Sequence, residues 1–153
     1  MNKIYIHYGA NKFNPDLFIE PGYNDEWTFK PVNGLWASED TDDSNVLTWK
    51  RWCLMNNFYV GNLENWFRFK LSDDAKGFVI KDSSIIDTPY VKYYNTDLPI
   101  HKYSRMVIDF DKLKEGGFTH IEFIENSWTQ WTFPLWDVDC ILIIDPNVIV
   151  PVE

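Results

Sequence analysis

Short apolar stretches, several of which alternate apolar and polar residues, recur from one end of the chain to the other. They constrain the fold more than any other feature. Successive side chains on a strand point to opposite faces, so alternation is typical of a half-buried strand. Glycines and prolines lie between the stretches and end them. The sequence therefore predicts strands at KIYIHYG (3–9), GLWAS (34–38), WFRFKL (66–71), GFVIKD (77–82), THIEFIE (119–125) and DCILIID (139–145).

Two other segments have a helical pattern. Residues 46–57 place their apolar side chains on one broad face without an interrupting proline, and Asp43 or Ser44 is positioned to cap that helix. FDKLKEGG (110–117) predicts a short helix that stops at the paired glycines. The face of the first helix that we expect to pack inward contains Leu47, Trp49 or Trp52, and Cys53.

Length and composition indicate one globular domain over residues 1–153. Hydrophobic residues make up 45% of the chain and charged residues 24%, and there is no repeat or low-complexity segment. Residues 83–106 have no clear pattern because two prolines interrupt them. Strands and short helices in this order predict an α+β fold with mostly antiparallel pairing. Aromatic residues reach 18%, so some rings must lie on the surface or line a cleft.

Charge and cysteine usage restrict the class of partner. The net charge of −9 disfavours a nucleic-acid backbone, which requires clustered Lys and Arg. Cys53 and Cys140 each lie in an apolar stretch, far apart and without histidine at ligand spacing, so we expect reduced thiols and no metal site. The chain has no signal-like N-terminus and no apolar run of membrane length, which predicts a cytoplasmic protein with no membrane partner.

The common catalytic and phosphate-binding motifs do not occur. The sequence has no GxGxxG, GxxxxGK[ST], GxSxG, HExxH or CxxC pattern. His101 and His120 have no partner at ligand spacing, and we expect both to be structural. His7 is either an ordinary residue of the first strand or one half of a ligand site.

Asp137 and Asp139 are the most informative pair of charges. On a strand, two residues that are two positions apart point to the same face. Carboxylates at the start of an apolar strand are costly unless they are solvated, paired or used. The pair is therefore either a polar strand entry at the surface or part of a functional site.

HYG (7–9), GLWAS (34–38) and VDCILIID (138–145), in this order, resemble the diphtheria-toxin and poly(ADP-ribose) polymerase branch of the ADP-ribosyltransferases. Members of this branch have a His-Gly element on the first strand, an aromatic strand followed by a helix, and an acid that opens a late apolar strand. The resemblance implies two packed, mostly antiparallel sheets with a few short helices that frame an NAD-sized cleft. It also implies that NAD is the substrate.

Carried over residue by residue, the resemblance implies a site for NAD. His7 would bond the adenosine-side ribose, and Gly9 would let its backbone approach the nicotinamide amide. Trp36 would stack on the nicotinamide, and Ser38, in the same GLWAS motif, would also contact NAD. Asp139 would take the place of the catalytic glutamate, beside the positive charge that develops in the transition state.

The chain departs from the family pattern in four places. One residue separates His7 from Gly9, the middle aromatic is tryptophan rather than tyrosine, and the acid is aspartate rather than glutamate. The family's second tyrosine has no clear match, although Trp49 or Trp52 stands near its place.

The expected function is transfer of ADP-ribose from NAD to a macromolecule, or hydrolysis of NAD. The acidic balance favours a protein acceptor over nucleic acid. The alternative is a non-catalytic interaction protein that grips a partner or a small ligand with its exposed aromatic residues.

Overall fold

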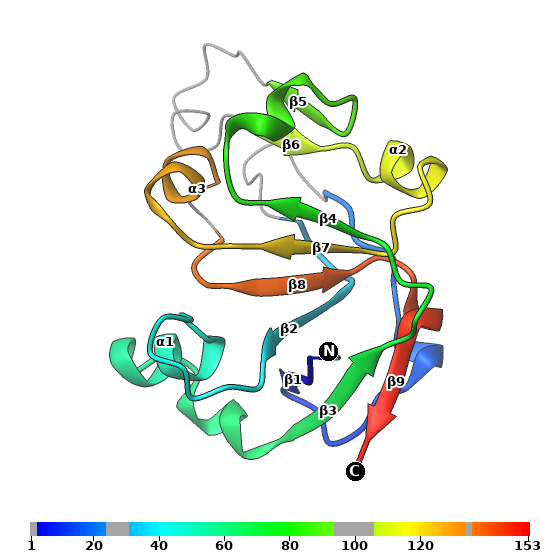
Figure 1. Cartoon of the computed structure of the whole chain (residues 1–153). Coiled ribbons are helices and arrows are strands. Elements are labelled where there is room, and N and C mark those ends of the chain that lie inside the picture. The colour runs from blue at the N-terminus through cyan, green and yellow to red at the C-terminus, as the bar shows by residue number, and fades with distance from the viewer. Residues whose placement is uncertain (1–2, 24–30, 94–105, 134–135) are drawn as a thin grey trace.

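The computed structural model describes residues 3–23, 31–93, 106–133 and 136–153. Within these residues the chain is a mixed α+β protein built on a seven-stranded sheet in the order β4-β7-β8-β2-β1-β3-β9 and a two-stranded sheet, β5-β6 (Figure 1). The strands are β1 (Tyr5–Tyr8), β2 (Leu35–Glu39), β3 (Trp66–Leu71), β4 (Gly77–Ile80), β5 (Val91–Tyr93), β6 (Met106–Ile108), β7 (His120–Phe123), β8 (Cys140–Ile143) and β9 (Ile149–Val152). The helices are α1 (Trp49–Asn56), α2 (Phe110–Glu115) and α3 (Ser127–Thr132), with short 3₁₀ turns between elements.

The α+β class and the mostly antiparallel pairing are confirmed, and all six predicted strand segments contain a strand. Among the strands of the described residues, only β4 and β7 pair in parallel. Their connection runs through β5, β6 and α2, because parallel neighbours need a long crossover. The two sheets are unequal, since the smaller consists of β5 and β6 alone. His101 lies outside the described residues.

The predicted helix 46–57 is shorter than its apolar pattern. It begins at Trp49, because Thr48 is the N-cap and its Oγ1 accepts a hydrogen bond from the Arg51 N–H at 3.2 Å. Neither Asp43 nor Ser44 caps it. Cys53 is the residue of this helix that is buried, whereas Trp49 and Trp52 are half-buried.

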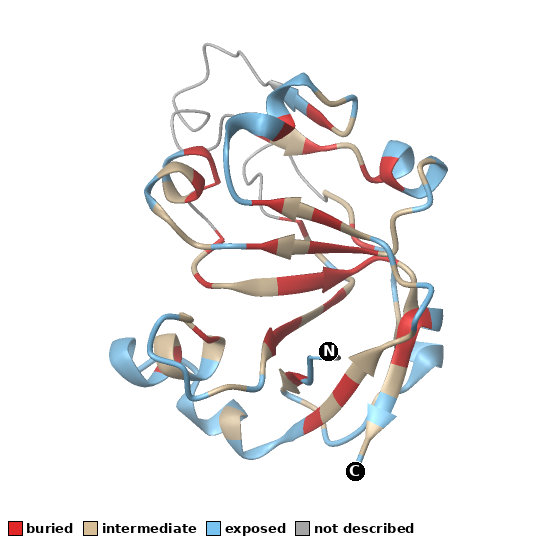
Figure 2. Cartoon of the chain, viewed as in Figure 1, coloured by how far each residue is buried: buried red, intermediate tan, exposed pale blue. Residues whose placement is uncertain are grey.

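Strand β8 separates two hydrophobic cores and is buried on both faces (Figure 2). Leu142 and Ile144 point into a core formed with β4, β5, β6, β7 and α2, whereas Ile141 and Ile143 point into a core formed with β1, β2, β3 and β9. This two-sided burial explains the continuous apolar run of DCILIID, because a strand with solvent on one face would alternate instead.

The sheet divides between β1 and β2. Their ladder has two residue pairs, Tyr5 with Glu39 and Ile6 with Ser38, and then stops. Beyond that point His7 stays paired with β3, while Trp36 stays paired with β8. The two halves of the sheet therefore form a fork, with β4, β7 and β8 on one side and β1, β3 and β9 on the other (Figure 1).

Candidate functional site

A cavity of about 260 Å³ opens at this fork, and we call it the fork cavity. Its walls come from β1, from β2, from the start of α1, from the turn after α1 and from the segment that precedes β8. The lining residues are Ile6, His7, Tyr8, Trp36, Ala37, Ser38, Trp49, Tyr59, Asn62, Trp136, Asp137, Val138 and Cys140. The fork thus brings together three of the predicted NAD contacts, His7, Trp36 and Ser38, from strands whose ladder has just ended.

The side chain of His7 forms a hydrogen bond to β2 beyond the point where the backbone ladder between β1 and β2 ends. Its Nδ1 lies 2.6 Å from the carbonyl oxygen of Trp36, and because a carbonyl only accepts, Nδ1 must carry the proton. Burial lowers the pKa of His7 below its usual range, although the bond to Trp36 opposes this shift. A neutral ring protonated at Nδ1 leaves Nε2 as a hydrogen-bond acceptor. His7 therefore offers the cavity a partner for a hydroxyl or an amide N–H.

Tryptophan rings form the apolar walls of the fork cavity. Trp36 meets Trp136 edge to face at 4.9 Å between ring centroids, and its Nε1 donates to the Asn33 carbonyl at 3.1 Å, which fixes the ring. On the other side Trp49 stacks on Trp52 at 5.3 Å, with an angle of 11° between the planes. Flat, apolar walls of this kind suit a planar heterocycle.

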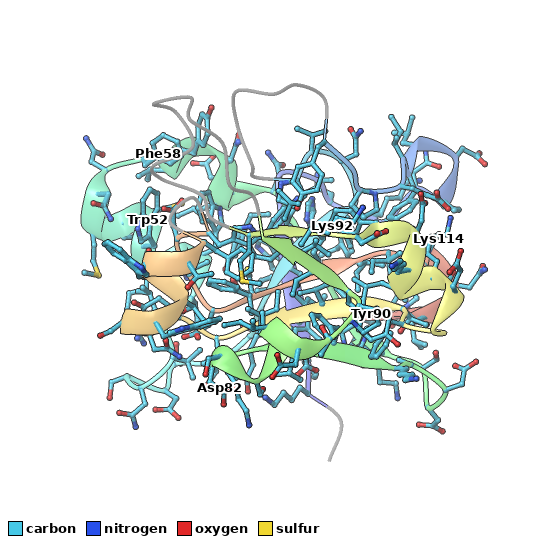
Figure 3. All side chains as sticks on the ribbon, turned by 90° about the horizontal axis from the view of Figure 1, so that it is seen from above. Trp52, Phe58, Asp82, Tyr90, Lys92 and Lys114 are labelled. Atoms are coloured by element: carbon cyan, nitrogen blue, oxygen red, sulfur yellow. The ribbon has the colours of Figure 1, made fainter. Side chains whose placement is uncertain are left out.

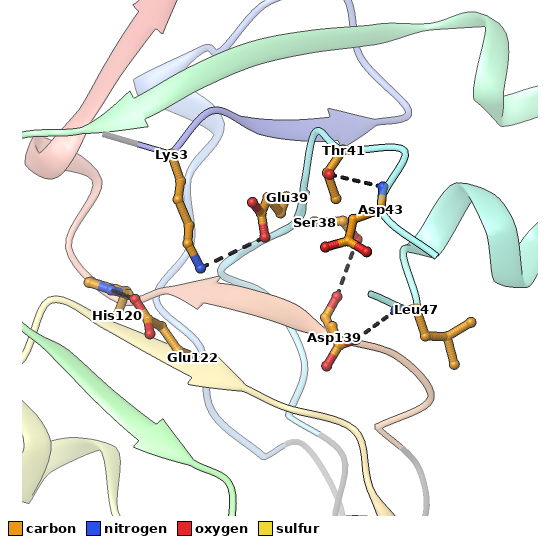
Figure 4. Close-up of polar contacts among 9 residues, drawn as sticks. All are labelled: Lys3, Ser38, Glu39, Thr41, Asp43, Leu47, His120, Glu122 and Asp139. Carbon is orange, nitrogen blue, oxygen red and sulfur yellow. Dashed lines mark hydrogen bonds and ion pairs between the residues drawn. The ribbon is translucent and has the colours of Figure 1, made fainter. Parts of the chain in front are cut away.

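Asp137, rather than Asp139, borders the fork cavity. The segment 136–139 is not a strand, since β8 begins at Cys140, so the two carboxylates do not share a face. Both oxygens of Asp139 accept backbone N–H groups. One bond comes from Leu47 at 2.7 Å (Figure 4), and the other comes from Glu125 at 2.8 Å. The expectation that Asp139 opens into the same cleft as His7 is therefore not met. Asp139 instead joins the loop before α1 to the loop before α3.

Ser38 borders the cavity, but its hydroxyl already has partners. Its Oγ accepts the N–H of Trp49 at 3.0 Å and donates to the carbonyl of Asp139 at 3.5 Å. The side chain is almost fully buried. These contacts hold β2, the start of α1 and the entry to β8 together, so Ser38 positions the walls of the cavity.

Gly9 lies directly after β1 and is not among the described residues that line the cavity. Its φ of +114° favours glycine, and its N–H donates to the Asn65 carbonyl at 2.8 Å. A Cβ placed there would lie 4.0 Å from His7 Nε2. The structure thus gives a conformational reason for this glycine next to the histidine ring.

The turn after α1 supplies two wall residues that the sequence patterns did not indicate, Tyr59 and Asn62. Asn57 and Tyr59 both adopt left-handed conformations, with φ of 48° and 47°, which are unfavourable for residues with a side chain. Between them, Phe58 packs edge-on against Trp52 at 5.4 Å. The asparagines and the glycine of NNFYVGN (56–62) are the sequence signal for a turn with left-handed residues. Strained backbone of this kind is common at ligand sites.

His120 and the two cysteines lie apart from any cluster of metal-ligating side chains in the described part of the chain. His120 is buried in β7. Its Nδ1 lies next to Thr119 Oγ1, and its Nε2 lies next to Glu122 Oε1 (Figure 4). Cys53 and Cys140 are free thiols, and Cys140 borders the fork cavity. Among the described residues, no three His, Cys, Asp or Glu side chains group as a metal site.

Comparisons with protein-family models, with curated proteins and with solved structures give no match for this chain. In the described part of the chain, no helix has the length and apolar character needed to cross a membrane.

Proposed function

We propose that the chain binds NAD in the fork cavity and transfers ADP-ribose to a macromolecule, preferably a protein, or to water. One observation supports this most: a histidine with an acceptor nitrogen and a tryptophan 29 positions later face one aromatic-walled cavity, which a carboxylate also borders. The ADP-ribosyltransferase resemblance calls for a histidine, an aromatic ring and a carboxylate at one site, and here tryptophan stands for the tyrosine and aspartate for the glutamate.

In this proposal each wall residue has a chemical role. The nicotinamide ring stacks between Trp36 and Trp49, and Nε2 of His7 accepts a hydrogen bond from a ribose hydroxyl. The bond between ribose C1′ and the nicotinamide nitrogen breaks, and its electron pair leaves with the nicotinamide. Positive charge develops on the ribose, and the acceptor or water then bonds to C1′ and releases its proton.

Asp137 is the carboxylate that we assign to this step, in place of Asp139. A fixed negative charge beside the developing positive charge lowers the barrier. Asp137 borders the cavity. Both oxygens of Asp139 accept backbone N–H groups, and Asp139 does not line the cavity.

Release of nicotinamide from NAD tests the assignment. Asp137→Asn should retain NAD binding, measured by calorimetry, and lower turnover on the order of a hundredfold. Asp139→Asn is the matched control, and its effect should follow the loss of folded protein. Normal turnover in Asp137→Asn would remove that residue from the mechanism, and a wild type that neither binds nor cleaves NAD would end the enzyme proposal.

A second candidate is a non-catalytic interaction protein. Leu54, Met55, Phe58 and Tyr59 are exposed apolar side chains on α1 and the turn that follows. Figure 3 shows Trp52 and Phe58 together at one end of the molecule, away from Lys114. Exposed aromatic residues are common in binding hot spots, so this function is the one to pursue if NAD does not bind.

A further inference from the structure

A second, polar cavity adjoins the fork cavity, and we call it the polar chamber. Its volume is about 230 Å³, and it shares Ile6, Tyr8 and Ser38 with the fork cavity. Ile6 and Ser38 form the last pair of the β1–β2 ladder, so the two cavities meet at the point where the sheet divides. Neither alone reaches the roughly 300 Å³ at which pockets for larger ligands begin.

The two cavities differ in charge. Among the described residues that line the fork cavity, none is lysine or arginine, so that cavity offers no cation to a phosphate. The polar chamber has Lys50 from the first turn of α1 and Arg68 from β3. In a chain with a net charge of −9, phosphate binding depends on such local cations.

Arg68 is held in place by its neighbours. Its Nε donates to Asp40 Oδ2 at 2.6 Å, and its guanidinium carbon lies 4.4 Å from the centre of the Trp66 ring. The Nη groups of Arg68 and the Nζ of Lys50 have no partner among the described residues, so both side chains can donate to a ligand.

The chamber also has carboxylates, which a bare anion would avoid. Glu39 pairs with Lys3 at 3.7 Å, and Asp40 pairs with Arg68. Asp42 remains as an acceptor on the wall. Carboxylates bind the hydroxyls of ribose, while Lys and Arg bind phosphate, so this mixed lining fits a sugar phosphate better than a simple anion.

We propose that the polar chamber is the second half of one binding site, in which Lys50 and Arg68 bind the phosphates of a dinucleotide and Asp42 accepts from a ribose hydroxyl. This inference rests on the proposed function, and it adds that affinity depends on the ribose-phosphate portion of NAD. The ligand then passes over Tyr8 and Ser38, with its flat ring in the fork cavity.

Binding of three probes, nicotinamide, ADP-ribose and NAD, tests this inference by calorimetry on the full chain. Lys50→Gln should weaken NAD and ADP-ribose about tenfold and leave nicotinamide unchanged, because it removes one charge-assisted contact. Lys70→Gln, on β3 but outside the chamber, is the matched control and should bind like wild type. Added NaCl should weaken NAD binding less steeply in Lys50→Gln than in wild type.

The outcomes separate the two proposals. If wild type binds NAD and Lys50→Gln binds it equally well, the polar chamber is not the phosphate site and the proposed function survives. Equal affinity of wild type for nicotinamide and NAD leads to the same conclusion. If wild type binds none of the three probes, the proposed function fails, and this inference fails with it.

Discussion

Two aromatic clusters flank the fork cavity, and they differ in burial. The inner cluster, Phe123, Phe133 and Trp136, is almost completely buried, with Trp136 only 1% exposed. The outer cluster, Trp49, Trp52, Phe58 and Tyr59, stacks just as closely, yet Tyr59 is 62% exposed. The inner cluster contributes Trp136 to the cavity wall, and the outer cluster contributes Trp49 and Tyr59. Core packing explains the inner rings, whereas the outer rings are not part of either hydrophobic core, and we propose that they serve binding.

Removal of the inner ring should have the largest effect on stability. Trp136→Ala should lower the free energy of unfolding by about 3–5 kcal/mol, because a buried indole leaves a large cavity. Chemical denaturation measures this loss. The control is Trp136→Phe, which keeps a ring and removes an indole N–H that has no acceptor among the described residues, so its cost should be smaller. If Trp136→Ala is as stable as wild type, the inner cluster does not contribute more to stability than the outer cluster.

Asp139 connects the loop before α1 to the loop before α3, and its loss should have the next largest effect on stability. Asp139→Ala leaves the N–H groups of Leu47 and Glu125 without their acceptor, which should cost about 1–3 kcal/mol in the free energy of unfolding. Asp137→Ala should cost less. If Asp137→Ala proves the more destabilising of the two, the structural role assigned to Asp139 is wrong.

The outer cluster should contribute less to stability than the inner one. Trp52→Ala removes the stack on Trp49 and the edge contact with Phe58, and it should cost about 1–2 kcal/mol because the ring is half-buried. Thermal unfolding of Trp52→Ala beside Trp136→Ala makes the comparison direct. A drop in melting temperature as large as that of Trp136→Ala would place the outer rings in the core.

The smallest expected effect on stability is the change that protonation of His7 causes as pH falls. Burial lowers the pKa of His7 in the folded chain below the ordinary 6.5, so the folded state resists a proton that the unfolded state accepts. The contribution of His7 to stability is therefore complete above pH 6.5 and decreases as pH falls toward the folded pKa. The free energy of unfolding, measured by denaturation, should differ between wild type and His7→Gln by an amount that depends on pH in this range. If the two plots of this free energy against pH run parallel, the His7 ring is not held neutral in the folded chain. NAD binding should weaken in the same direction, because protonation of Nε2 removes its acceptor.

Local patterns predicted most of the secondary structure. The strand WFRFKL matches β3 at both ends, and the paired glycines end α2 as expected. The strand β9 was not predicted, because Pro151 interrupts its pattern. The sheet tolerates this proline because β9 is an edge strand. The first helix was predicted too long, because apolar periodicity does not show which polar residue will cap it.

The sequence by itself determined the α+β class and the late apolar strand at 139–145, and the family resemblance named His7, Trp36 and Ser38 as candidates for one site. Tertiary structure alone decided that the β1–β2 ladder stops after two pairs, which opens the fork cavity. It also decided that Asp137 borders the cavity while Asp139 binds Leu47 and Glu125. The physical reason is that these contacts join segments far apart in the chain, and side-chain spacing fixes a direction only where the backbone is a regular strand or helix.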